Sequence, residues 1–234
     1  MSNAVPQDDP DRDWFRGEAA ATGCQVHQGS DASRRLNAMG LRAEFFERAL
    51  VDGHDKASRV SKVHPRTFPG QVMWAETVAS LRTQLLDLGT GWSVGYTGNC
   101  ETCYNLSYRV AIAVVGGDSS TGEQAFRPPK AARKRGPAIG ERVKRNPYVQ
   151  DMLDLPEFRE MNDDEQCTMW FLMANARDGR MYHELALPTS LGGDNRVGVY
   201  GERIIMPPIP LKGASITPDD GGDREPPQVD VGRK

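Results

Sequence analysis

The sequence lacks most of the patterns that identify an enzyme or a membrane protein. Its 234 residues contain no run of 18 apolar residues, and acidic residues stand near the start where a secretory signal would carry basic ones. There is no G-x-x-x-x-G-K-[ST] or G-x-G-x-x-G phosphate loop and no H-E-x-x-H zinc helix. We therefore expect a cytoplasmic protein with no membrane contact and no cofactor. The absences favour a non-enzymatic role without deciding it.

Large apolar residues are scarce at both ends of the chain. Hydrophobic residues make up 38% of the sequence, and the deficit falls mainly in residues 1–35 and 212–234. Segments with so little apolar surface cannot offset the entropy lost on ordering. We predict a disordered acidic tail over 1–35 and a second disordered tail over 212–234. Residues 36–211 then have the size of one domain.

Helical periodicity is clearest in residues 71–88, which are followed by Gly89. Five apolar residues recur there at the spacing of one helix face: Trp74, Val78, Leu81, Leu85 and Leu88. This pattern predicts an amphipathic helix packed on the core. A further helix is predicted over 36–51, and two short helices over 147–154 and 156–165, each opened by a proline.

Residues 108–116 are apolar on both alternating faces, as in a strand buried on both sides. We place this strand at the centre of a sheet and predict that residues 92–96 pair with it. Later, the dipeptide Asp178-Gly179 separates two strand-like runs, which is typical of a hairpin. Residues 168–174, 181–187 and 197–206 therefore predict a three-stranded antiparallel meander. Helices and strands in separate blocks indicate an α+β domain with a mixed or antiparallel sheet packed by helices.

Four cysteines are present, and Cys100-x-x-Cys103 has the spacing of a metal or redox pair. With Cys24 and His27, which also have ligand spacing, the pair could complete a tetrahedral zinc site. However, 72 residues separate the two pairs, and the stronger zinc-finger spacings are absent. A redox pair normally precedes a helix, whereas this one precedes a strand. We therefore predict no metal and two reduced thiols in a loop.

A basic segment spans residues 127–145, where eight basic residues and one acidic residue give a local charge of +7. The net charge of the chain is -3, so the remaining residues carry -10. Such a segment can follow a phosphate backbone, although a solvated, mobile connection has the same composition. It contains no aromatic residue on which bases would stack. The predicted nucleic-acid contacts are Lys130, Arg133, Lys134, Arg135, Arg142, Lys144 and Arg145.

The main alternative function is a divalent-metal nuclease or phosphodiesterase. Asp178, Glu184 and Glu202 belong to the predicted meander, and carboxylates on neighbouring strands can hold a metal that activates water. Asp118, in the Gly- and Ser-rich turn after the central strand, is a fourth candidate. No [DE]-x-K pattern occurs on a predicted strand, and charges on strands commonly pair with one another instead.

Three segments, residues 109–122, 183–188 and 201–207, resemble parts of uncharacterised bacterial proteins from mobile-element and DNA-processing gene neighbourhoods. They cover 27 of the 234 residues. The resemblance transfers no activity and no catalytic residue, but it implies a bacterial, mobile-element context linked to DNA. Our first prediction is thus a non-enzymatic accessory protein that contacts DNA or a DNA-processing partner through the basic segment. A pure protein-interaction module is a further alternative.

Overall fold

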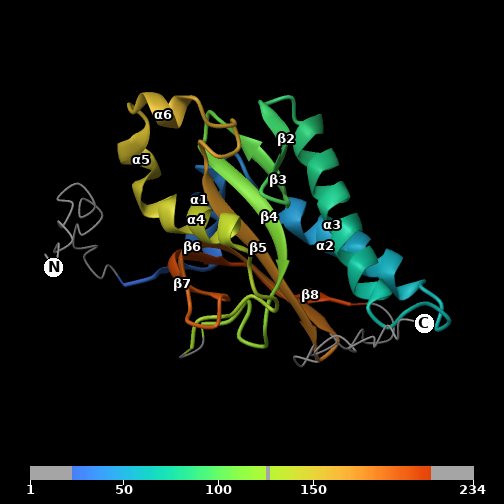
Figure 1. Ribbon diagram of the computed structural model, residues 1–234. Coiled ribbons are helices and arrows are strands. Elements are labelled where there is room, and N and C mark those ends of the chain that lie inside the picture. Colours follow the sequence, from blue (N-terminus) through green and yellow to red (C-terminus); the bar gives the residue numbers. More distant parts are fainter. Residues whose placement is uncertain (1–22, 125–126, 212–234) are drawn as a thin grey trace, which may run out of the picture.

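The computed structural model describes residues 23–124 and 127–211, which build one mixed sheet of eight strands with helices on both faces (Figure 1). The strand order is β1-β7-β6-β5-β4-β3-β2, and β8 pairs with β6. β1 is parallel to β7 and β4 is parallel to β5, while the other pairs are antiparallel. The strands are β1 (Gln25–His27), β2 (Trp92–Thr97), β3 (Cys100–Asn105), β4 (Val110–Gly116), β5 (Thr168–Arg177), β6 (Arg180–Leu191), β7 (Val197–Ile205) and β8 (Ile209–Pro210). The predicted α+β class with a mixed sheet is confirmed.

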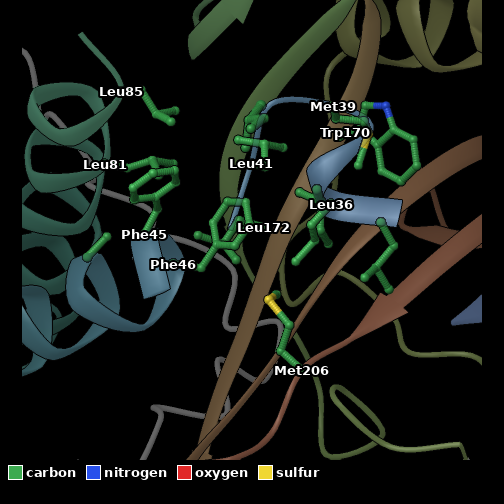
Figure 2. Packing of buried hydrophobic residues seen from close by; sticks show 14 of the residues in the cluster. Leu36, Met39, Leu41, Phe45, Phe46, Leu81, Leu85, Trp170, Leu172 and Met206 are labelled. Carbon is green, nitrogen blue, oxygen red and sulfur yellow. The ribbon is translucent and has the colours of Figure 1, made fainter. Parts of the chain in front are cut away.

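Three helices cover one face of the sheet: α1 (Gly29–Asn37), α2 (Ala43–Ser58) and α3 (Phe68–Asp87). Together with this face they enclose the first core, in which side chains of α2 and α3 meet Leu172 of β5 (Figure 2). The opposite face carries α4 (Pro137–Arg145), the 3-10 turn η2 (Asn146–Tyr148), α5 (Val149–Met152) and α6 (Pro156–Arg159) (Figure 1). A second core lies there, between α4 and the other side chains of β4 to β7. None of the helices within the described ranges is long and apolar enough to cross a membrane.

The helix predicted over 71–88 is confirmed and begins earlier, at Phe68, because Pro69 fits the first helical turn. The single helix predicted over 36–51 is wrong. The chain breaks at Gly40, whose φ of 66° is unfavourable for other residues. A Cβ atom at Gly40 would also lie 2.5 Å from the ring of Tyr108. The turn at Gly40 therefore divides this region into α1 and α2.

The prediction of a disordered tail over 1–35 extends too far. Residues 25–27 form β1 and residues 29–37 form α1, which buries Ala32 and Leu36 against the sheet. Two apolar contacts and pairing with β7 order this stretch despite its polar composition. Residues 1–22 and 212–234, the rest of the predicted tails, lie outside the described residues.

The central strand and the meander are confirmed as β4 and as β5, β6 and β7. The hairpin turn at Asp178-Gly179 has φ values of 51° and 67°, as a two-residue turn of this kind requires. By contrast, residues 92–96 do not pair with the central strand. They form β2, which pairs with β3, so the predicted Cys-x-x-Cys loop is itself a strand. The two short helices predicted over 147–154 and 156–165 exist as the shorter α5 and α6.

Candidate functional site

The first half of the basic segment, 127–145, is fixed to the sheet. The amide of Ala132 donates to the carbonyl of Gly116, and the amide of Ala131 donates to the carbonyl of Val197, both at 2.9 Å. Ala131 is fully buried in the second core. The interpretation of this stretch as a mobile connection is therefore wrong, because its backbone is held between the end of β4 and the start of β7.

The second half of the basic segment forms α4, which the sequence did not predict. Ile139 and Val143 of α4 face the second core. Arg142 lies on the same buried side, where its Nη1 donates to Asp164 Oδ2 at 3.1 Å and its Nη2 to the Asp164 carbonyl. Both side chains of this ion pair are almost completely buried. Arg142 thus stabilises the fold, and its predicted role as a nucleic-acid contact is wrong.

Arg135 and Arg145 are also partly withdrawn from the surface. The guanidinium of Arg145 donates to Glu165 Oε1 at 3.4 Å, and that of Arg135 lies 5.7 Å from the ring centre of Phe171. Burial lowers the pKa of Arg135 from its usual value. Neither arginine presents a fully exposed charge, because both side chains pack against the rest of the domain.

Four of the predicted contacts remain exposed on this surface: Lys130, Arg133, Lys134 and Lys144. Lys130 Nζ lies 3.3 Å from Asp194 Oδ2 in the loop between β6 and β7. Both groups of this pair are solvent-exposed, so it is weak and a phosphate can compete for the lysine. We call Lys130, Arg133, Lys134 and Lys144 the exposed cations.

The sequence interpretation missed one residue that adjoins the exposed cations. Arg196 follows Asp194 in the β6–β7 loop, and this loop contacts the basic segment through the Arg135 amide, which donates to the Asn195 carbonyl at 2.9 Å. Arg196 is half-exposed and adds positive charge there. It lies 51 residues after Arg145, so no local charge pattern points to it.

The acids proposed for a metal-dependent nuclease do not form a site. Glu184 is buried on the side of the second core and binds Arg203, while Glu202 lies on the other face and binds Arg35. Asp178 sits in the exposed β5–β6 turn, and Asp118 accepts a hydrogen bond from the Ser120 amide in its own loop. In the part of the chain that the structure describes, no group of three His, Cys, Asp or Glu side chains can hold a metal ion.

The residues considered for zinc are also far apart. Cys24 and His27 lie at one edge of the sheet, and four strands separate β1 from β3, which carries Cys100 and Cys103. Strand alternation directs Cys103 into the first core and Cys100 towards the second. Burial raises the pKa of Cys103 to about 12, so its thiol stays protonated at neutral pH. All four cysteines lie within the described residues, where none forms a disulfide.

No family model matches the chain, and neither a curated protein nor a solved structure is significantly similar to it. Of the predicted site, the exposed cations remain at the surface, and Arg196, which the sequence did not indicate, lies in the loop that contacts the segment carrying Lys130, Arg133 and Lys134.

Proposed function

We propose that the protein is a non-enzymatic accessory protein that contacts DNA through the exposed cations. The observation that carries this proposal is the fixed backbone of the segment with Lys130, Arg133 and Lys134, which is hydrogen-bonded to both β4 and β7. A charged side chain on an ordered backbone loses less entropy on binding than one on a free loop. Lys130, Arg133 and Lys134 are therefore suited to bind a chain of phosphates.

The chemistry of this surface favours contacts with phosphates over contacts with bases. Lysine acts towards phosphate as a point charge, and contacts of this kind position a protein on DNA without reading its sequence. The basic segment also has no aromatic residue on which bases would stack. We expect binding that does not depend on DNA sequence but depends steeply on salt. A plot of log affinity against log salt concentration should have a slope of about -0.9 for each phosphate contact.

The test is a fluorescence-anisotropy titration with single- and double-stranded DNA and with RNA. The salt concentrations are about 50 and 200 mM, a range over which phosphate contacts weaken strongly. In the variant K130A/R133A/K134A, we expect affinity at the lower salt to fall about tenfold or more for every sequence, and the salt slope to decrease by about 3.

The matched control is K56A/R59A/K62A, which removes three solvent-exposed basic side chains at and after the end of α2. This control loses the same charge from the helical layer on the other face of the sheet, so its affinity should change little. Equal loss in both variants would show a general charge effect. Binding that survives K130A/R133A/K134A would refute the proposed surface. Absence of binding to any nucleic acid would favour the protein-interaction alternative.

A further inference from the structure

The strand β2 is the last strand at one end of the sheet, and among the described strands it pairs only with β3. Arg82 Nη2 donates to the carbonyls of Gly95 and Thr102, at 3.1 and 2.9 Å, and these two residues lie opposite each other on β2 and β3. One nitrogen can reach both carbonyls only if they lie between the two strands. Because backbone groups alternate in direction along a strand, the N–H and C=O groups of Val94 and Tyr96 point to the open edge.

This edge lacks the features that normally keep a sheet edge from pairing. Such edges are very short, or they carry a lysine, a proline or a bulge. The other strands with a single partner follow this rule, since β1 has three residues and β8 has two, including Pro210. By contrast, β2 has six residues in continuous register, with no charge and no proline. An edge of this kind indicates pairing with a further strand.

The open edge of β2 also carries exposed apolar side chains. Val94 is 50% exposed and Tyr96 is 63% exposed. Val94 lies opposite Cys103, whose side chain belongs to the first core, so Val94 and Tyr96 lie on the face of the sheet that α3 covers. The apolar part of this edge therefore adjoins α3, which contacts β2, β3 and β4 (Figure 1).

One side of α3 faces away from α2. The side towards α2 is marked by Ser80, which donates to Asp52 Oδ2 at 2.6 Å, and by Gln84, which donates to the Phe45 carbonyl at 3.0 Å. A step of two residues turns about 200° around a helix, so the residues two positions further on lie on the opposite side. The residues of this opposite side are Phe68, Val72, Ala75, Ala79, Arg82 and Leu86.

We call these six residues the α3 stripe. They are spaced alternately by four and three positions, as in the seam between two packed helices. Ala75, Ala79 and Leu86 are exposed. The one charged member, Arg82, is paired with Glu101 at 2.6 Å. Overall, α3 has three charged residues among 20, whereas α2 has six among 16. A helix that is apolar on nearly all sides is normally covered on all of them.

We propose that the open edge of β2 and the α3 stripe together bind a second copy of this chain across a two-fold axis. The two β2 strands pair antiparallel, so that one sheet runs through both copies. An axis perpendicular to the sheet keeps both helical layers on one face, and the two α3 helices pack there side by side along their stripes. Val94 and Tyr96 of both copies then lie on the same face of the new strand pair.

The surface fits a second copy better than a peptide strand. A peptide bound to β2 would leave the α3 stripe uncovered, whereas an identical chain brings a strand and a helix in matching positions. A two-fold contact also sets each group near its own copy, and this surface has no unpaired charge to oppose itself. Stable interfaces use roughly 20 or more residues on each side, so the six of β2 need the helix contact as well. This dimer does not depend on the nucleic-acid proposal.

The experiment is sedimentation velocity on the full chain. We expect a dissociation constant of about 10 µM, so that the chain is mostly monomeric near 1 µM and mostly dimeric near 100 µM. The variant L86K/V94K should raise this constant about tenfold or more, because it sets ammonium groups near their own copies and lysine blocks edge pairing. The control V63K/V199K adds the same charge at two other exposed valines and should leave the constant unchanged. Circular dichroism checks that both variants are folded.

Hydrogen exchange followed by mass spectrometry tests the strand pairing itself. The peptide that contains β2 should exchange more slowly near 100 µM than near 1 µM, because its outward amides then bond to the second copy. The peptide that contains β3 is the internal control. Its strand is already paired with β2 and β4 within one chain, so its exchange should change little.

Four results would overturn the inference. A chain that stays monomeric at about 100 µM does not form this dimer. Equal association of L86K/V94K and the wild type would place the contact on another surface. A dimer in which β2 exchanges as fast as in the monomer would exclude pairing of the strand edges. Slow exchange of β2 to the same degree at both concentrations would show that the edge is covered within one chain.

Discussion

Glu184 and Arg203 form a buried ion pair across β6 and β7, with hydrogen bonds of 2.8 and 2.6 Å from the guanidinium to the two carboxylate oxygens. Glu184 also accepts a hydrogen bond from the Gly122 amide at 2.7 Å, and Arg203 donates to the Glu123 carbonyl at 2.9 Å. The pair therefore attaches Gly122 and Glu123, in the connection between β4 and the basic segment, to the sheet.

Removing one partner of this pair should destabilise the protein strongly. We expect Arg203→Met to lower the free energy of unfolding by about 3–5 kcal/mol, because it leaves the buried Glu184 carboxylate without its counter-charge. Urea-induced unfolding followed by circular dichroism measures the loss. The double variant E184L/R203M should recover most of it, since no unpaired charge then remains. A loss below about 1 kcal/mol in Arg203→Met would contradict the role given to this pair.

Arg142 and Lys144 offer a matched comparison within α4. Arg142→Met should destabilise the domain by about 3 kcal/mol or more, because the buried Asp164 carboxylate loses the counter-charge of Arg142. Lys144→Met should change stability by less than about 0.5 kcal/mol, as expected for an exposed side chain. At a temperature where both variants are folded, Lys144→Met should lower DNA affinity more than Arg142→Met does. Thermal unfolding and the anisotropy titration give the two quantities, and a larger affinity loss in Arg142→Met would contradict this assignment.

Stability should fall as the pH drops from about 6.5 to about 4, in part because of His183. Its pKa is lowered from 6.5 to about 4 in the folded protein, so the unfolded chain binds a proton in this interval that the native state excludes. The contribution is fully present above the unfolded pKa and amounts to a loss on the order of 3 kcal/mol across the window. His183→Gln should lose less stability than the wild type between pH 7 and pH 4.5. Parallel pH profiles of the free energy of unfolding would contradict the prediction.

The four thiols should react with a disulfide reagent at different rates under native conditions. Cys24 is exposed and should react first, whereas burial raises the pKa of Cys103 and of Cys167 to about 12 and hides both from solvent. A kinetic trace with 5,5′-dithiobis(2-nitrobenzoate) should therefore show one fast thiol. Cys24→Ser should abolish that phase, and its persistence in the variant would show that one of the other three thiols, Cys100, Cys103 or Cys167, is the fast one.

Local patterns were sufficient for the elements that local residues determine. The helical spacing from Trp74 to Leu88 and the Asp178-Gly179 turn predicted α3 and the β5–β6 hairpin. By contrast, β3 contains the polar residues Thr102 and Asn105, whose burial depends on distant partners. Thr102 donates to Asp164 Oδ2 at 3.2 Å, and Asn105 donates to the Thr90 carbonyl at 3.0 Å. The sequence does not reveal such pairing, so it predicts a loop where this strand forms.

Dependence on partners that are distant in the sequence also limits prediction of the site. In the sequence, Arg142 and Arg145 look no different from Lys130 or Arg133. Their partners Asp164 and Glu165 lie 22 and 20 residues away and meet them only in the folded chain. Charge composition located the basic segment, but the fold separates the cations that hold α4 in place from those that face solvent.

The pairing of β1 with β7 also bears on the order in which the strands of the sheet can assemble. Gln25 aligns with Glu202, and Arg35 binds a carboxylate 167 residues further along the chain. The hairpins of β2 with β3 and of β5 with β6 need only short loops to close, so we expect them to form early. During synthesis, β1 leaves the ribosome long before the strand that receives it. One edge of the sheet therefore stays incomplete until β7 has been made, and β1 can join it only then.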